Sequence, residues 1–229
     1  MKIDRHGKAK ILTQGEIQLL FNQGFQSHRD RALFGICLFS ACRIREACTL
    51  KVIDAYTPNG QVLPKLIIRK GNTKGKLATR TIPITQDLKI LLTNYQPKPK
   101  QPYLFPGRFG SYYQPDSADK ALRLACKRVG LIGVSSHSFR RTALTQMSDN
   151  GIPLRVIMEV SGHRNMAQVA AYIEVRDEQV LGAVNSLSML SPVAEGEATS
   201  EVESDSGKLP FPPLKPHSSS HPHSETSQP

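Results

Sequence analysis

Three separated stretches of the chain carry arginine, histidine and tyrosine side chains that could together transfer a phosphoryl group. The first contains Arg43, the second contains His137 and Arg140, and the third contains His163 and, nine residues later, Tyr172. Arginine binds phosphate oxygens through a planar, permanently charged fork. A tyrosine becomes a nucleophile once a cationic pocket or a base helps to remove its proton. The set predicts attack by a tyrosine on a phosphodiester, with the cations neutralising the transition state.

Each of these patterns is common when it stands alone. A histidine three residues before an arginine, as in His137 and Arg140, occurs by chance in many proteins, although the two would share one helix face. Gly162 before His163 is ordinary helix termination. A single residue such as Tyr172 is more often a half-buried core tyrosine than a nucleophile. The prediction therefore rests on the order and spacing of the whole set.

Most of the elements that would position these residues are expected to be helices. A capping box from Thr13 to Glu16 opens a first helix that ends near Gly24. Residues 29–41 form a second helix that is apolar around most of its circumference and hence central to the core. Further helices are expected over residues 43–50, 87–92, 117–129, 136–147, 153–161, 166–173 and 177–190. The short helix over residues 166–173 would carry Tyr172.

A strand-rich region lies between the first arginine and the later helices. Residues 51–53, 66–68 and 79–84 are rich in β-branched side chains and predict three short antiparallel strands. A polar turn over residues 71–76 joins the second strand to the third. The hairpin carries three lysines, Lys70, Lys74 and Lys76. The fold class is therefore α+β, mainly α-helical with a small three-stranded antiparallel sheet.

Composition divides the chain into three parts. Residues 1–10 are a basic lead-in, and residues 11–190 contain the expected helices, the strands and the candidate site. Residues 191–229 are rich in proline, serine, glutamate and histidine and lack apolar periodicity. Such a segment cannot bury enough apolar surface to fold, so we expect a disordered tail.

The charge of the chain is concentrated outside this tail. The formal net charge of the 229 residues is +11, and the tail carries six acidic residues against two lysines, which is −4 and leaves +15 on residues 1–190. A body this basic favours a polyanionic partner, because bound phosphates release counterions. Charge alone is equally consistent with a soluble basic protein that has no such partner.

The cysteines and the hydropathy of the chain restrict its environment. The cysteines form no C-x-x-C pair and have no metal-ligand spacing, so we expect buried free thiols, a reducing compartment and no metal site. No apolar run is long enough to span a membrane, and no signal-peptide core follows Met1. We therefore expect a soluble cytoplasmic protein with no membrane partner, associated with the nucleoid if its source is prokaryotic.

Taken in order, the motifs resemble the catalytic domain of the tyrosine recombinase, or phage integrase, family over about residues 11–190. The segment from Ala41 to Glu46 is similar to the family's G-L-R-x-x-E segment, with Arg43 as its arginine. The segment from His137 to Arg140 is similar to the H-x-L-R box, with a phenylalanine in place of leucine. The segment from Ser161 to His163 is similar to the L-G-H box, with a serine in place of leucine. The family's tyrosine follows nine residues later.

The resemblance implies a role for each motif residue. Arg43, Arg140 and His163 would stabilise the phosphorane-like transition state. Tyr172 would attack the scissile phosphate, form a 3′-phosphotyrosyl bond and leave a free 5′-hydroxyl, while His137 helps to accept the tyrosine proton. The 5′-hydroxyl of a second strand would reverse the step. No metal or nucleotide cofactor is implied, because the covalent link keeps the energy of the phosphodiester.

The resemblance also implies supporting residues around these five. The family's catalytic lysine lies on the hairpin between its second and third strands, and Lys74 is the predicted proton donor to the leaving 5′-oxygen. Lys70 and Lys76 stay open as alternatives, because hairpin lengths vary. Glu46 falls where the family has an acidic residue that supports the site. Further DNA contacts are expected from Arg45, Lys70, Lys76, Arg141 and Arg164.

The expected function is that of a site-specific DNA recombinase or integrase that cleaves and rejoins DNA. One alternative is a non-catalytic DNA-binding regulator or relic that keeps the fold, but such a protein has no need to retain Tyr172. A type IB topoisomerase-like enzyme shares the chemistry without strand exchange, and the motif spacing favours the recombinase.

Partners follow from the same resemblance. We expect double-stranded DNA, a homotetramer assembled on it and accessory DNA-binding proteins. The helix over residues 177–190 is expected either to pack on a neighbouring protomer, as in the family, or on its own core. Family members usually carry a separate helical DNA-clamping domain, whereas about ten residues precede the first expected helix here. We therefore expect this chain to lack the clamp and to bind DNA more weakly and less specifically.

Overall fold

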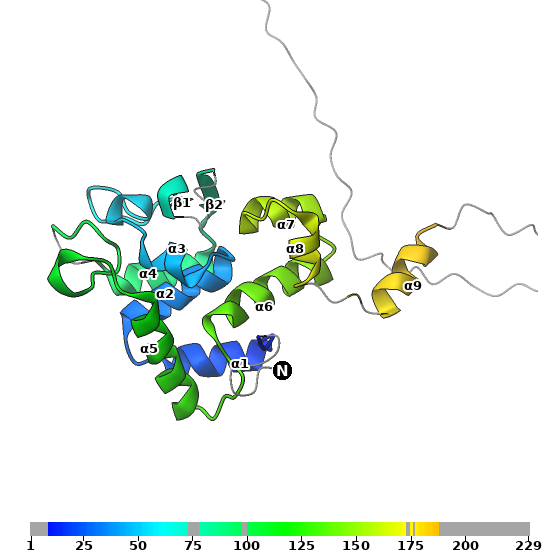
Figure 1. Ribbon diagram of the computed structural model, residues 1–229, viewed down its shortest axis with the longest axis horizontal. Coiled ribbons are helices and arrows are strands. Elements are labelled where there is room, and N and C mark those ends of the chain that lie inside the picture. Colours follow the sequence, from blue (N-terminus) through cyan, green and yellow to red (C-terminus); the bar gives the residue numbers. More distant parts are fainter. Residues whose placement is uncertain (1–8, 73–77, 98–99, 173–174, 176, 188–229) are drawn as a thin grey trace, which may run out of the picture. The chain divides into compact units, whose positions relative to one another are not determined.

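A computed structural model describes residues 9–72, 78–97, 100–172, 175 and 177–187 (Figure 1). These residues form α-helices and one two-stranded sheet. The helices are α1 (Gln14–Leu19), α2 (His28–Phe39), α3 (Ile44–Cys48), α4 (Gln86–Tyr95), α5 (Pro115–Arg128), α6 (Ser136–Asp149), α7 (Leu154–Ser161), α8 (Met166–Ala170) and α9 (Asp177–Asn185). The strands are β1 (Lys65–Ile68) and β2 (Arg80–Pro83). The mainly helical α+β class is confirmed.

Helix α2 is the centre of the core. It contacts α3, α4, α5 and α6, and every residue from Ala32 to Leu38 is buried, as expected for a helix that is apolar on all sides. Gly35 lets α4 approach closely, because a Cβ atom there would lie 2.5 Å from Cδ1 of Leu91. The site residues on α3 and α6 are therefore attached to one rigid central helix.

An aromatic stack joins α2 to α6. The ring of Phe34 stacks on Phe25 at a centroid distance of 5.0 Å and on Phe139 at 5.1 Å, and Phe139 also meets the edge of Phe21 at 6.3 Å. Offset and edge-on ring contacts add to the free energy gained by burial. Phe139 stands where the resembled motif has leucine, so the larger ring is accommodated by other aromatic rings directly beneath the candidate site.

The sheet contains two strands in the described residues rather than the predicted three. β1 and β2 are antiparallel, with Ile68 opposite Arg80. The segment predicted as the first strand forms a 3₁₀ turn over Val52–Asp54, and only Lys51 makes an isolated bridge. The buried carboxylate of Asp54 accepts a hydrogen bond from the Lys51 amide at 2.9 Å. This side-chain cap favours a turn over a strand ladder, so the prediction of a third strand is wrong.

Several helix ends are set by the predicted local signals. The Thr13 hydroxyl accepts from the Glu16 amide at 3.2 Å and the Glu16 carboxylate accepts from the Thr13 amide at 3.1 Å, which confirms the capping box. Leu20–Gly24 continues α1 as a π-helical turn and ends at the predicted glycine. Pro115 begins α5 two residues before the predicted start, since proline is well suited to the first helical turn.

Other features concern the environment of the chain. The four cysteines (Cys37, Cys42, Cys48 and Cys126) are buried and free, as predicted. No helix in the described ranges is long and apolar enough to cross a lipid bilayer.

Residues 1–8 of the predicted lead-in and all of the predicted tail, 191–229, lie outside the described residues.

Candidate active site

Helix α3 begins directly after the first predicted arginine. Arg43 is the N-cap residue, and its amide donates to Oε2 of Glu46 at 2.9 Å while its guanidinium donates to Oε1 at 3.3 Å. An arginine at a helix start opposes the helix dipole, and the acidic Glu46 three residues later offsets that cost. The Arg43 side chain is 31% exposed whereas that of Glu46 is 1% exposed. A buried carboxylate thus orients a guanidinium that a ligand can reach.

Arg140 projects from α6 into the space behind this pair. It is buried, and its guanidinium donates through Nη1 to the Ala41 carbonyl. Ala41 has a φ of 48°, a left-handed conformation that is uncommon for alanine. Burial, with the nearby charge of Arg43, lowers the pKa of Arg140 to about 10, so the guanidinium remains charged at pH 7. The strained residue before the α3 motif therefore aims its carbonyl at a buried cation.

His163 lies against Arg140 and is neutral at pH 7. Burial, with the charges of Arg140, Arg43 and Arg80, lowers the pKa of His163 to about 4. The Ser161 hydroxyl donates to the Ile157 carbonyl at 2.7 Å, so it accepts at 2.8 Å from Nδ1 of the histidine. Nε2 is then the acceptor for Nη2 of Arg140 at 2.9 Å. Ser161, which replaces leucine in the resembled motif, thereby selects one tautomer.

Tyr172 is placed beside this histidine. The two ring centroids are 5.6 Å apart at an interplanar angle of 41°. The tyrosine carbonyl accepts from the hydroxyl of Thr145 on α6 at 3.2 Å, and its ring packs in a small apolar cluster with Leu144 and Val169. The prediction that Tyr172 lies on a helix is wrong. Helix α8 ends at Ala170, and the tyrosine follows in a turn, held by contacts to α6.

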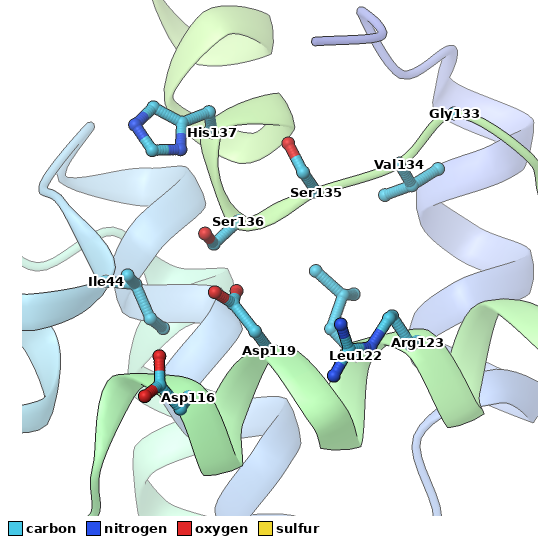
Figure 2. Close-up of a pocket in the computed structure, with 10 residues that line it drawn as sticks. All are labelled: Ile44, Asp116, Asp119, Leu122, Arg123, Gly133, Val134, Ser135, Ser136 and His137. Atoms are coloured by element: carbon cyan, nitrogen blue, oxygen red, sulfur yellow. The ribbon is translucent and has the colours of Figure 1, made fainter. Parts of the chain in front are cut away.

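His137 occupies the first turn of α6, on the exposed side of the site. It lies at one end of a cavity of about 630 Å³, which also contacts Ile44, the residue after Arg43. Figure 2 shows Asp116 and Asp119 on α5, below the start of α6. His137 is exposed and Arg140 is buried. The two residues of the H-x-x-R pattern therefore stand at different depths of the site.

The remaining predicted residues have separate outcomes. Lys74 and Lys76 lie outside the described residues, while the Lys70 amide donates to the Thr79 hydroxyl at 3.1 Å. Arg45 and Arg164 are exposed, as a DNA contact requires.

Arg141 differs from these two exposed arginines. Its side chain is buried, with a residue exposure of 7%, and its guanidinium donates to the Ala9 carbonyl. The hydrogen bond connects α6 to the segment before α1. The guanidinium of Arg141 thus has a structural role inside the fold, and its contact with DNA stays a prediction.

Arg80 is a site residue that sequence reasoning did not single out. Its Nη2 donates to Oε2 of Glu46 at 2.7 Å, and its side chain is 10% exposed. The signal was the alternation of side chains along β2. Arg80 lies two residues from the buried Ile82, so both belong to the inward face of the strand. An arginine on an inward face needs a carboxylate partner, and Glu46 is that partner.

Three arginines and one carboxylate thus meet in one small region. Although burial opposes its ionisation, the hydrogen bond and charge of Arg80, the Arg43 amide and the charge of Arg140 lower the pKa of Glu46. Arg43, Arg80 and Arg140 then carry three positive charges against one negative charge, with His163 neutral. The excess positive charge suits an anion such as a phosphodiester beside the Tyr172 ring.

Comparison with known proteins places this chain in a family. The phage integrase family matches residues 10–179. The chain is 26% identical over 182 residues to a tyrosine recombinase of Pseudothermotoga lettingae, covering 77% of this chain and 60% of that protein. It is 28% identical over 194 residues to the tyrosine recombinase XerA of Pyrococcus furiosus, covering 82% and 65%. The chain thus spans less than two thirds of the length of these relatives.

Solved structures agree on the fold. The crystal structure of XerA recombinase aligns with a TM-score of 0.63 at 18% identity, over 81% of this chain and 66% of that chain. XerH site-specific recombinase bound to its difH substrate aligns with a TM-score of 0.61 at 20% identity, over 82% and 57%. The predicted resemblance is confirmed, and because the family match covers most of the chain, this protein belongs to the phage integrase family.

Proposed function

We propose that this chain catalyses site-specific cleavage and rejoining of DNA through a 3′-phosphotyrosyl intermediate. One observation carries the proposal: the contact of His163 with both Arg140 and Tyr172, from three different elements. A tyrosine that has only a packing role does not need a buried arginine and a tautomer-selecting serine behind its neighbour. The curated relatives are named tyrosine recombinases, which supports the same reaction.

Double-stranded DNA is the proposed substrate. The related XerH structure contains its difH substrate, and a charge of +15 on residues 1–190 favours a polyanion. The exposed Arg45 and Arg164 stand on either side of the buried cations in the sequence and are the proposed contacts to the DNA backbone. Because a recombinase acts on the DNA of its own cell, we propose that the protein works inside the cell. Accessory DNA-binding proteins stay a prediction.

The geometry suggests a role for each site residue in the cleavage step. The oxygen of Tyr172 forms a bond to phosphorus while the bond to the 5′-oxygen breaks. Arg43 and Arg140 neutralise the charge that develops on the non-bridging oxygens, and both are held in place before DNA arrives. His163 fixes the orientation of the Arg140 guanidinium by accepting a hydrogen bond at Nε2. His137 accepts the tyrosine proton at the exposed end of α6, and Lys74 is the proposed donor to the leaving oxygen.

A covalent adduct tests the proposal directly. Nicked duplexes that contain candidate recombination sites from the DNA flanking the gene trap the intermediate, because the cleaved fragment diffuses away. We expect a DNA–protein adduct that survives denaturing electrophoresis with the wild-type protein and is absent with Tyr172→Phe. The phenylalanine keeps the ring contact with His163, so loss of the adduct reports loss of the nucleophile.

A second variant separates chemistry from binding. Arg43→Ala is expected to abolish the adduct while salt-sensitive DNA binding persists, because one partly exposed arginine contributes little to the total charge. If wild-type protein binds every candidate site without forming a Tyr172-dependent adduct, the chain is a DNA-binding protein and the enzymatic proposal fails.

We also propose that the protein assembles as a tetramer on DNA through α9. Within the described residues, α9 and the turn after it expose an apolar face made of Val180, Leu181, Val184 and Leu187. A separate groove of about 390 Å³ lies between α1, the end of α2, α6 and α7, and its lining includes Phe39, Met147 and Val160. An apolar face and a separate apolar groove on the same chain fit a head-to-tail arrangement, in which α9 of each protomer occupies the groove of the next.

A further inference from the structure

We propose that Arg80 is a positioning residue for DNA cleavage, which holds Glu46, and through it Arg43, against the turn that carries His163. The proposal rests on the proposed function, because it concerns the same site. Arg80 does not need to touch DNA for this role. It acts on groups that do.

The first supporting observation is a bridge of two arginines across one buried carboxylate. Oε2 of Glu46 accepts from Arg80 at 2.7 Å and from the Arg43 amide at 2.9 Å, while Oε1 accepts from the Arg43 guanidinium at 3.3 Å. The shortest of the three bonds is the one to Arg80. Without the bond to Arg80, Glu46 would be bonded only to Arg43, the residue whose side chain it orients.

The second observation is a direct contact between Arg80 and the turn before His163. Gly162 has a φ of 69°, and a Cβ atom at this position would lie 2.7 Å from Nη1 and 3.1 Å from Cζ of Arg80. Only glycine combines this backbone conformation with such a close approach. The guanidinium therefore lies on the backbone immediately before His163. One side chain from β2 thus reaches both halves of the site.

The third observation is that Arg80 is not optimally satisfied. Its Nε atom is buried and has no hydrogen-bond partner among the described residues. A buried donor without a partner is uncommon in a residue that serves stability alone. The position favours the charge and the reach of arginine over a fully paired side chain, which is expected where function sets the residue type.

Arg69 offers a matched comparison on the same hairpin. Its Nε donates to Oδ1 of the fully buried Asp54 at 2.6 Å, and its side chain is 43% exposed. This pair also ties the hairpin to the body through an arginine and a buried carboxylate. Within the described residues, Arg69 forms no hydrogen bond or ion pair with Arg43 or His163. A role limited to anchoring the hairpin would therefore be shared by Arg69, whereas a positioning role would not.

The charge of Glu46 provides a readout that packing alone would not move. Arg80 is its strongest stabilising partner, and the charges of Arg43 and Arg140 also face it, as do Cys42 and His163. Removal of Arg80 leaves burial to dominate, so the pKa of Glu46 rises. The carboxyl then binds its proton at a higher pH and releases the Arg43 guanidinium. Cleavage should therefore be lost at a higher pH as the solution is acidified.

The experiment compares Arg80→Gln, Arg80→Lys and Arg69→Gln in the full chain. Single-turnover adduct formation on the nicked duplex is measured at saturating DNA across the acidic range, with DNA affinity and thermal midpoint measured on the same samples. For Arg80→Gln we expect cleavage slower by about 10- to 100-fold, as for outer residues that orient a reacting group, an acid limb moved to higher pH and unchanged DNA affinity. Arg80→Lys should restore part of the rate. Arg69→Gln should keep the wild-type rate and pH profile.

A titration independent of activity accompanies these rates. The carboxyl carbon of Glu46, followed by ¹³C NMR, should titrate at higher pH in Arg80→Gln than in the wild type. A wild-type rate and Glu46 titration in Arg80→Gln would overturn the proposal, as would an equal loss in Arg69→Gln. The absence of any adduct with the wild-type protein would instead overturn the proposed function. If the wild-type protein forms the adduct and the pH profile of Arg80→Gln is not shifted, the positioning role alone is overturned.

Discussion

At the scale of single residues, the site is built on charge that is fixed before any ligand arrives. His163 is kept neutral by burial and by three neighbouring guanidiniums, and its tautomer is set by the serine two residues earlier. Arg140 is held between that ring and the Ala41 carbonyl. Side chains already held in place need little reorganisation during the reaction, which is how enclosed polar sites lower a barrier.

Because His163 is buried in its neutral form, the folded protein loses stability in acid. Its folded pKa of about 4 lies below the ordinary value of 6.5, so the unfolded chain binds more protons between these values. Stability is therefore complete above about pH 6.5 and is lost as the pH falls toward 4, by a contribution on the order of 3 kcal/mol. We expect the free energy of unfolding of His163→Asn to lack this loss between about pH 6.5 and pH 4. Urea unfolding at several pH values measures it, as the difference between variant and wild type.

The comparison isolates one group, because every other carboxyl and histidine titrates in both proteins. If the free energies of unfolding of the two proteins keep a constant difference from pH 7 to pH 4, the histidine is not buried in its neutral form. The tautomer assigned through Ser161 would then also be wrong.

At the scale of elements, the turn between α7 and α8 is the most constrained part of the site. Gly162 ends α7 in a left-handed conformation with Arg80 against it. Gly162→Ala should cost about 1 kcal/mol in backbone strain, plus the displacement of the guanidinium. Gly151→Ala is the control, because its φ is 71° and nothing lies within 4 Å of the added Cβ. Both variants should lose the stability that corresponds to the strain, Gly162→Ala should lose more, and only Gly162→Ala should slow adduct formation.

Equal cleavage rates in these two alanine variants would contradict the contact between Arg80 and the turn. A slower rate in Gly162→Ala alone would show that the added methyl group disturbs the site and does not act only through the stability of the fold. Chemical denaturation and the nicked-duplex assay on the same preparations provide both measurements.

The elements also explain which features the sequence could predict. The cap at Thr13 and the helix end at Gly24 each depend on residues within one turn, so both signals can be recognised from the local sequence. The motif residues were found because their order along the chain resembles a family. Arg80 was missed because its partner, Glu46, lies 34 residues earlier in the sequence, and only folding brings the two together.

The errors have the same physical origin. Residues 51–53 are β-branched in part and look like a strand, but the side chain of Asp54 caps a turn and pairs with Arg69, 15 residues away. The helix predicted over residues 166–173 includes Tyr172, but α8 ends at Ala170. Tertiary contacts with α6 hold it in the turn beyond α8. Propensity was overridden in both places by a specific long-range partner.

At the scale of the whole molecule, the proposed assembly on DNA depends on apolar surface that a single chain leaves exposed. Leu181 on α9 is 63% exposed, whereas Leu124 on α5 is also exposed but does not line the groove. Leu181→Asp should abolish complexes larger than a single protein on DNA, because a charge cannot enter the apolar groove without losing its hydration. Leu124→Asp should leave them intact. Sedimentation of the protein–DNA mixtures measures the stoichiometry.

Loss of higher complexes in both leucine variants would point to a general effect of added negative charge near DNA. Retention of a tetramer by Leu181→Asp would exclude α9 as the connecting element. DNA binding by the single protein should survive in either variant, since the arginines of the site are unchanged.

The position of Tyr172 sets a length scale for this assembly. Five peptide units separate it from Asp177, the first residue of α9. A chain of that length reaches at most about 18 Å. When α9 occupies a neighbour's groove, Tyr172 must therefore lie within this reach of the bound α9, and so close to the neighbouring protomer. The reach of the nucleophile becomes a property of the spacing between protomers, so the separation of binding sites on DNA can decide which tyrosines reach phosphorus.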